Sequence, residues 1–112
     1  MKLRVEQDSR GQILRPEGEI DLHYTPELRE RLLRLIGTGS AIVVDMSGVT
    51  YIDSSGVATL VEGLKRARDA GQAFLVAGVQ DAPMRVLELT RLDQVFALYP
   101  DRESALQALR SD

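Results

Sequence analysis

The sequence contains no cysteine and no tryptophan, and it has few aromatic residues of any kind. Without cysteine the chain cannot form disulfides, thiolate metal sites or a catalytic thiol. Aromatic residues make up only 4% of the 112 residues. Aliphatic side chains must therefore fill the core, and the aromatic platforms on which single-stranded nucleic acids stack are missing. The formal net charge of −3 also argues against a general nucleic-acid-binding protein.

Long apolar runs are absent as well. No run approaches the roughly 20 apolar residues of a membrane-spanning helix, and no signal peptide opens the chain, so we expect a cytoplasmic protein. Hydrophobic residues account for 44% and charged residues for 28%, which is typical of a folded globular chain. A chain of this length has room for one modest core, so we expect a single domain that spans residues 1–112.

Hydrophobic periodicity and turn residues predict strands that alternate with helices after an opening hairpin. This alternation indicates the α/β class with a mixed, partly parallel sheet. The predicted strands cover residues 1–7, 12–18, 42–44, 73–77 and 95–98, and the predicted helices cover residues 26–36, 55–68 and 83–90, with a last helix that begins at residue 101.

Two residues make specific predictions about the ends and edges of these elements. Thr25 precedes Pro26, and this pair is typical of a helix start with Thr25 as the N-cap. Pro16 falls within the second strand of the hairpin. We expect it at a sheet edge or a bulge, because proline cannot donate a ladder hydrogen bond.

The most informative stretch begins at Asp53 and continues into a predicted helix. At helical spacing, Ser54 lies on the flank of the apolar stripe and is predicted to be the N-cap. Ser55 lies nearly opposite the stripe, in line with Thr59, and is predicted to be exposed in the first turn. Free N–H groups and the helix dipole favour added negative charge there. The stripe itself consists of Val57, Leu60, Val61 and Leu64.

Small residues follow one side of the same helix. Gly56 would leave the backbone uncovered next to Ser55, so that a partner could approach closely. Gly56, Gly63 and Ala67 together would form a smooth flank suited to packing against another surface.

The sequence Asp-Ser-Ser-Gly at residues 53–56 is preceded by Asp-Met-Ser-Gly-Val-Thr-Tyr-Ile at 45–52 and by Gly-Glu-Ile-Asp at 18–21. In this context it resembles the STAS domain family, whose type members are anti-sigma factor antagonists of bacterial partner-switching systems. The resemblance spans nearly the whole chain and includes residues 85–96. One departure is Arg91, where many members have glycine. The resemblance implies a sheet of four or five strands covered by about four helices.

In that family the second serine of the motif is phosphorylated by the cognate anti-sigma factor kinase, and here that serine is Ser55. The resemblance implies a protein that is not an enzyme. It would bind the kinase when unphosphorylated, release it when Ser55 is phosphorylated, and be reset by a phosphatase. The chain itself carries no motif for phosphoryl transfer, and we expect no cofactor and no metal. The predicted switch residues are Asp21, Asp53, Ser54, Ser55, Gly56 and Thr59.

Other interpretations remain open from the sequence. Asp-Ser-Ser-Gly is also common as a capped loop. STAS domains also serve as accessory subunits of lipid-transport ABC systems, where they bind a permease or ATPase constitutively. A serine hydrolase could use Ser55 and His23 with Asp21 or Asp53, although the Gly-x-Ser-x-Gly elbow is missing. A lone histidine does not make a metal site. We take the free protein to be a monomer by default.

Overall fold

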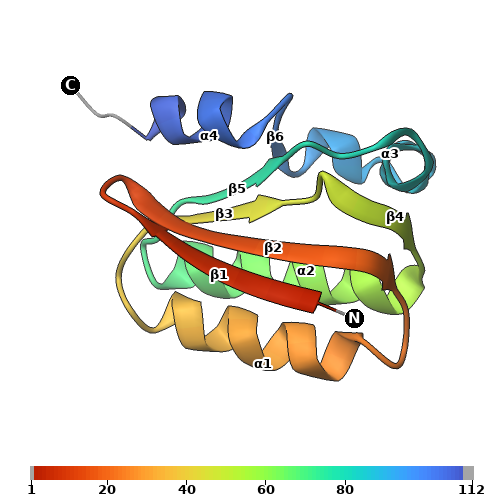
Figure 1. The fold of residues 1–112 in the computed structure, drawn as a ribbon, viewed down its shortest axis with the longest axis horizontal. Helices are drawn as coiled ribbons and strands as arrows, with labels where there is room; N and C mark the ends of the chain where they lie inside the picture. The colour runs from red at the N-terminus through yellow and green to blue at the C-terminus, as the bar shows by residue number, and fades with distance from the viewer. Residues whose placement is uncertain (1, 110–112) are drawn as a thin grey trace.

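The computed structural model describes residues 2–109, in which a six-stranded mixed sheet combines with four α-helices and one short 3-10 helix, η1 (Figure 1). The predicted α/β class is confirmed. The strands are β1 (Lys2–Asp8), β2 (Gly11–Ile20), β3 (Ile42–Asp45), β4 (Gly48–Ile52), β5 (Phe74–Ala77) and β6 (Ala97–Tyr99). The helices are α1 (Thr25–Ile36), α2 (Ser54–Asp69), α3 (Asp81–Leu89), η1 (Leu92–Gln94) and α4 (Arg102–Ala108).

The long strand β2 organises the sheet, whose main path runs β1-β2-β3-β5-β6. On one side β2 forms the predicted antiparallel hairpin with β1. On its other side it pairs in parallel with two strands in succession, β3 along residues 12–14 and β4 along residues 17–20. The predicted count of four or five strands does not include β4, because the pattern of this segment indicates only a short apolar piece.

Pro16 lies where β2 changes partners. The N–H of Gln12 donates to the Ala41 carbonyl on the β3 side, and backbone groups alternate in direction along a strand. The nitrogen of Pro16 therefore faces the same side, in the gap between the β3 and β4 ladders. The expectation of an edge position was wrong, because β2 is paired on both sides. The pairing is nevertheless irregular at Pro16, since residues 14–17 of β2 lie opposite residues 44–48. No ladder hydrogen bond is needed there.

The two faces of the sheet are covered differently (Figure 1). Helices α1 and α2 cover one face and enclose the main core, which includes Leu14, Leu28, Leu32, Val44 and Leu60. Helix α4 covers part of the other face with a smaller apolar cluster of Ile13, Val43, Leu75, Ala77, Ala105 and Leu106.

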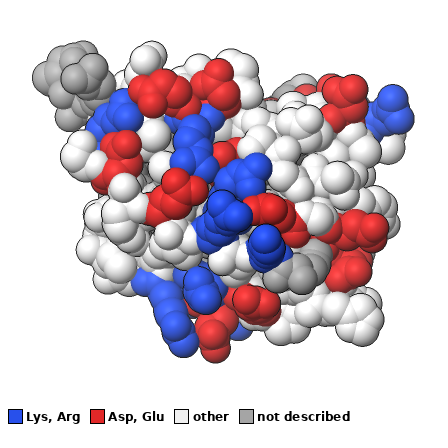
Figure 2. All heavy atoms as spheres, viewed as in Figure 1, with Lys and Arg blue, Asp and Glu red and all other residues white. Residues whose placement is uncertain are grey.

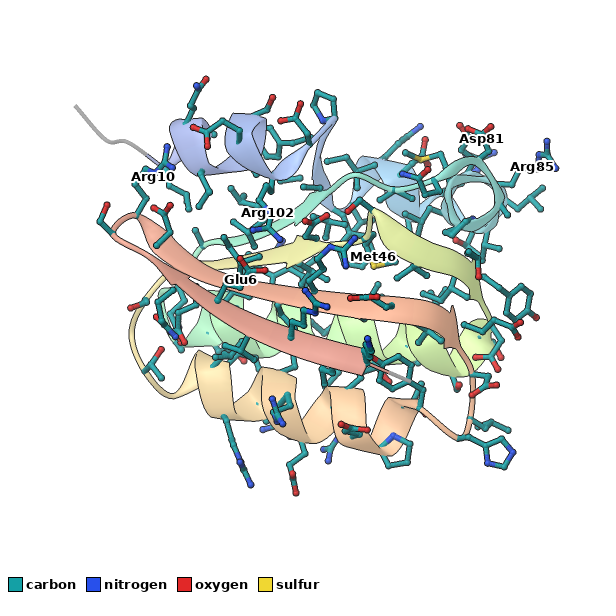
Figure 3. All side chains as sticks on the ribbon, in the orientation of Figure 1. Glu6, Arg10, Met46, Asp81, Arg85 and Arg102 are labelled. Atoms are coloured by element: carbon teal, nitrogen blue, oxygen red, sulfur yellow. The ribbon has the colours of Figure 1, made fainter. Side chains whose placement is uncertain are left out.

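Ion pairs extend over the part of that second face formed by β1 and β2. Figure 2 shows Lys and Arg side chains interspersed with Asp and Glu in a band across this view. Arg102 of α4 joins the carboxylates of Glu6 and Asp45, at 2.9 Å from each (Figure 3). The other pairs of this band include Arg4–Glu17, Arg15–Glu17, Arg15–Asp45, Arg10–Asp8 and Arg10–Glu103.

The structure bears on two positions of the helical segments that the sequence singled out. Thr25 is not the N-cap of α1: that position belongs to Tyr24, and Thr25 is buried as the first helical residue. Arg91 has a left-handed backbone with φ of 61° at the start of η1. Glycine adopts this conformation without the steric cost that a Cβ brings, which is a physical reason for the glycine that the family resemblance implies at this position.

Candidate functional site

Asp53 begins helix α2 as its N-cap. Its backbone is extended, and its Oδ1 accepts hydrogen bonds from the backbone N–H groups of Ser55 at 2.9 Å and Gly56 at 3.1 Å. The prediction that Ser54 caps the helix was wrong, and Ser54 is the exposed first residue of α2. Helical spacing fixes which residues share a face, but it does not fix the residue at which the helix begins, and aspartate is as good a cap as serine.

The hydroxyl of Ser55 donates to the same carboxylate oxygen, with 2.6 Å between Ser55 Oγ and Asp53 Oδ1. This hydrogen bond, followed by those from the two backbone N–H groups, holds the pKa of Asp53 below its usual value. Asp53 is therefore an ionised acceptor at neutral pH, and the proton of the serine points toward it. Ser55 is half-buried rather than exposed as predicted, because its hydroxyl is turned back to the cap.

Thr59 supports this first turn from beneath. Its hydroxyl donates to the Ser55 carbonyl at 2.8 Å, and the residue is buried. Thr59 follows Ser55 along the helix as predicted, but its side chain is buried, and its part in the switch stays a prediction. The angular position of a residue in a helix does not predict which other elements, such as β4, contact that helix.

Gly56 is buried, so the expected open backbone beside Ser55 was wrong as well. A Cβ added to Gly56 would lie 2.6 Å from Ile52 Cγ1 and 2.7 Å from Ile20 Cγ2. Farther along the helix, a Cβ on Gly63 would overlap the side chain of Leu32 of α1. The smooth flank exists, but the surface against which it packs is the interior of the same chain.

Asp21 lies beside the motif because β2 and β4 end together. Ile20 is paired with Ile52 in the parallel ladder, and the N–H of Asp53 donates to the Ile20 carbonyl at 3.1 Å. The Asp21 carboxylate accepts the backbone N–H groups of His23 at 3.0 Å and Tyr24 at 3.3 Å. The structure thus brings the two aspartates to one end of the sheet, where Asp21 shapes the loop before α1.

Two exposed apolar side chains that the motifs did not predict flank this end. Leu22 follows Asp21 and is 72% exposed, and Tyr51 of β4 is 47% exposed. Large apolar side chains that remain in water next to polar groups are typical of protein contact sites. The available sequence signal was strand alternation in β4, which places Tyr51 opposite the buried Ile52.

The residues described here do not form a hydrolase triad or a metal centre. The hydroxyl of Ser55 is bonded to Asp53, and within residues 2–109 no hydrogen bond links it to His23, which is exposed. The same residues contain no group of three or more potential metal-ligating His, Asp or Glu side chains. No helix within residues 2–109 has the length and apolar composition needed to cross a bilayer.

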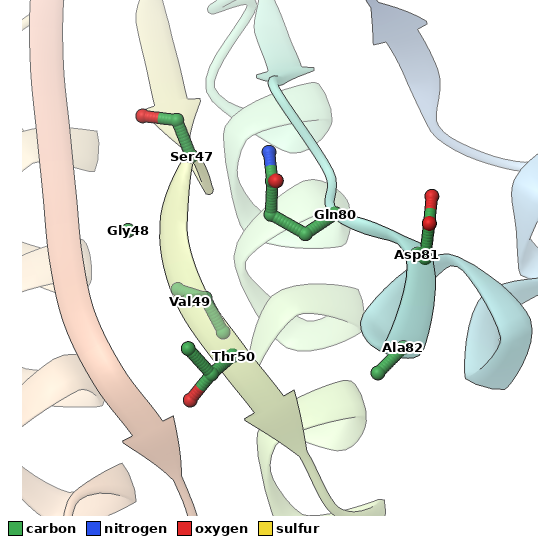
Figure 4. A pocket seen from close by; sticks show the side chains of 7 residues that line it. All are labelled: Ser47, Gly48, Val49, Thr50, Gln80, Asp81 and Ala82. Atoms are coloured by element: carbon green, nitrogen blue, oxygen red, sulfur yellow. The ribbon is translucent and has the colours of Figure 1, made fainter.

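A shallow hollow of about 490 Å³ lies between β4 and the start of α3 (Figure 4). Its lining offers hydroxyl, amide and carboxylate groups but no basic side chain, so it is poorly suited to a nucleotide phosphate. The lining residues are Ser47, Gly48, Val49, Thr50, Gln80, Asp81 and Ala82.

Comparison with known proteins identifies the class to which this fold and motif belong. The STAS domain family model matches residues 2–105, and the chain belongs to this family. Among its relatives, the anti-sigma-B factor antagonist of Bacillus subtilis (strain 168) is 27% identical over 90 residues, which cover 80% of this chain and 83% of the relative. The protein of the same description from Staphylococcus aureus (strain NCTC 8325 / PS 47) is 30% identical over 95 residues, or 82% of this chain and 88% of the relative.

Solved structures agree with this assignment. An anti-sigma factor antagonist from Mycobacterium paratuberculosis superposes with a TM-score of 0.90 at 29% identity, over 98% of this chain and 94% of that one. The fold is also that of SpoIIAA, whose unphosphorylated form has a TM-score of 0.83 over 97% of this chain and 96% of its own. Its phosphorylated form has a TM-score of 0.76 over 97% of this chain and 100% of its own, with 19% identity in both cases.

Proposed function

We propose that this STAS domain is an anti-sigma factor antagonist whose complex with an anti-sigma factor is ended by phosphorylation of Ser55. The single observation that carries the proposal is the hydrogen bond from the Ser55 hydroxyl to the Asp53 carboxylate at the start of α2. The names of the relatives support the same function. The bound kinase would be the anti-sigma factor, a separate phosphatase would reset the domain, and a domain with such partners would work in the cytoplasm.

The geometry suits a serine that accepts a phosphoryl group from an external kinase. Ser55 Oγ would attack the γ-phosphorus of ATP held by the partner, forming the serine O–P bond while the bond to the ADP oxygen breaks. The Asp53 carboxylate, 2.6 Å from Ser55 Oγ, is placed to take the hydroxyl proton. The role of Asp53 is then to orient and deprotonate the acceptor, in addition to capping the helix.

The product explains release without a change of fold. A phosphoserine carries about −1.5 to −2 charges near neutral pH. The helix N-terminus tolerates this charge, but the ionised Asp53 repels it and can no longer accept a hydrogen bond from the hydroxyl. The phosphate would thus point outward, into a partner surface that contacts Leu22 and Tyr51. A desolvated like-charge or apolar contact there costs several kcal/mol, which is a change in affinity of orders of magnitude.

The test is affinity capture from a lysate of the organism that encodes the chain, with wild type, Ser55→Ala and Ser55→Asp as baits. Ser47→Ala and Ser47→Asp are matched controls, because Ser47 lies in the same Asp-x-Ser-Gly pattern at residues 45–48. We expect wild type, Ser55→Ala and both Ser47 variants to retain a small ATPase-type kinase. Ser55→Asp should retain at least about a hundredfold less of it.

Purified kinase and ATP should then label wild type and Ser47→Ala but not Ser55→Ala. Equal capture of the kinase by Ser55→Ala and Ser55→Asp would contradict the proposal. If all five baits hold the same transporter permease or ATPase instead, the domain is a constitutive accessory subunit.

A further inference from the structure

The outer edge of β1 has no partner among the strands that the structure describes, because β1 ends the main path of the sheet (Figure 1). The backbone direction along this edge follows from two observations. The N–H of Gln12 points to Ala41 on the β3 side, and Gln12 is the register partner of Gln7. Gln12 and Gln7 are therefore a non-hydrogen-bonded pair, and the backbone groups of Gln7, Val5 and Leu3 point away from β2 to the free edge.

The side chains of β1 separate by face. Leu3 and Val5 pack against the main core. The charged side chains Lys2, Arg4, Glu6 and Asp8 occupy the opposite face. The order of these charges is positive, positive, negative, negative, so that the strand is complementary to an antiparallel copy of itself.

Only one antiparallel register uses this complementarity fully. With the two-fold axis at Val5, Arg4 lies opposite Glu6 and Lys2 lies opposite Asp8 of the second copy. Any other centre from Leu3 to Gln7 places like charges directly opposite one another, which destabilises strand pairing. The Val5 centre also joins residues whose backbone groups already point outward. We propose that β1 pairs antiparallel with β1 of a second copy of this chain, about an axis at Val5.

The carboxylates on this edge are held in place before pairing. Both oxygens of Glu6 accept hydrogen bonds from Arg102, at 2.9 and 3.1 Å (Figure 3). Asp8 is held by Arg10 at 2.9 Å. Arg4 reaches Glu17 at 3.3 Å and remains 57% exposed. A carboxylate has lone pairs for a further donor, so Glu6 and Asp8 can each accept a second cation across the axis.

The dimer would join two sheets into one and leave the switch site open. Strand β2 lies between β1 and β4 in the sheet, and β4 leads into the helix that carries Ser55, so the proposal does not depend on the function of Ser55. A contact restricted to one pair of strands is below the area of a stable interface. We expect dissociation constants of about 10 µM to 1 mM, and this weak dimer replaces the monomer that is the default expectation from the sequence.

Charge reversal tests the register in solution. Sedimentation velocity of wild type from about 10 µM to about 1 mM should show a monomer–dimer equilibrium. Arg4→Glu and Glu6→Arg should each weaken self-association at least about tenfold, because each places like charges opposite in both halves of the pair. An equimolar mixture of the two variants should restore association, since every cross-strand pair then has opposite charges.

A second pair of variants keeps the test valid if Glu6→Arg fails to fold. Gln7→Pro removes an N–H that faces the free edge, where proline is tolerated, and should abolish dimerisation with little change in the thermal midpoint. Gln7→Ala should dimerise like wild type. A wild type that remains monomeric at about 1 mM overturns the proposal. Undiminished dimers of Arg4→Glu and Gln7→Pro also overturn it.

Discussion

The pattern Asp-x-Ser-Gly occurs twice in the chain, at residues 45–48 and 53–56, and the two copies begin with the same local turn. In each, the aspartate Oδ1 accepts the backbone N–H of the serine two residues on, at 3.0 Å in the first and 2.9 Å in the second. The first copy leads into strand β4, whereas the second begins helix α2. A shared turn therefore does not decide whether a strand or a helix comes next.

The surroundings of the two aspartates differ in charge. The side chain of Asp45 is only 5% exposed, with its Oδ2 2.9 Å from Arg102 Nε and 3.8 Å from Arg15 Nε. Burial raises its pKa, but hydrogen bonds from Ser47 and Arg102 outweigh burial and lower the pKa overall. Asp53 forms no ion pair among residues 2–109, and its acceptor oxygen faces a hydroxyl and two N–H groups. The charge of Asp45 is neutralised by arginines within the fold. The charge of Asp53 has no such partner among the described residues, so a phosphate placed beside it would be repelled.

The largest expected effect separates the two aspartates in stability. Asp45→Asn leaves two arginines without their buried counter-ion, and we expect a loss of about 2–3 kcal/mol in the free energy of unfolding. Asp53→Asn retains a good capping residue and should cost much less. Urea unfolding followed by circular dichroism measures both. Equal losses of stability in the two variants would contradict the prediction, because the arginines beside Asp45 would then add nothing to its contribution.

The two glycines that end the patterns give the next effect. Gly56→Ala forces a Cβ against Ile52 and Ile20, and we expect a loss of about 1–3 kcal/mol. The atoms nearest to a Cβ on Gly48 would belong to the flexible side chains of Glu17 and Arg15, at 3.1 and 3.2 Å. Gly48→Ala should therefore cost less than about 1 kcal/mol. The same unfolding series compares the two variants, and a greater loss for Gly48→Ala would contradict the packing around Gly56.

The smallest effect is the acid dependence of stability. Because the folded state lowers the pKa of Asp45, its charge contributes stability above the unfolded pKa, and this is lost as the pH falls through the folded pKa. Removing this group should flatten the acid side of the stability curve below about pH 4, with a change in slope of at most about 1.4 kcal/mol per pH unit. Unfolding curves of wild type and Asp45→Asn across this range test the prediction. An unchanged slope in the variant would contradict it.

Local patterns predicted much of the fold. The hairpin, the apolar strands and the helix after Asp53 follow from alternation, helical spacing and turn residues, which act over a few positions. The switch of partner along β2 did not follow, since it depends on β4 pairing beyond Pro16. In the candidate site too, local patterns predicted some features, whereas others depend on residues distant in sequence. The relevance of Asp53 and Ser55 could be predicted, but the burial of Gly56 depends on Ile20, which is distant in sequence.

Arg102 and Glu103 have a consequence for synthesis on the ribosome. Arg102 binds Glu6, and Glu103 binds Arg10, so these ion pairs join residues 96 and 93 positions apart. The hairpin, β3 and the helices α1 and α2 can emerge and begin to pack before Arg102 and Glu103 have been synthesised. The second face of the sheet can close only after residue 103 has left the exit tunnel. Until then Ile13 and Val43 remain uncovered, and the nascent chain exposes an apolar surface that favours aggregation until α4 has packed.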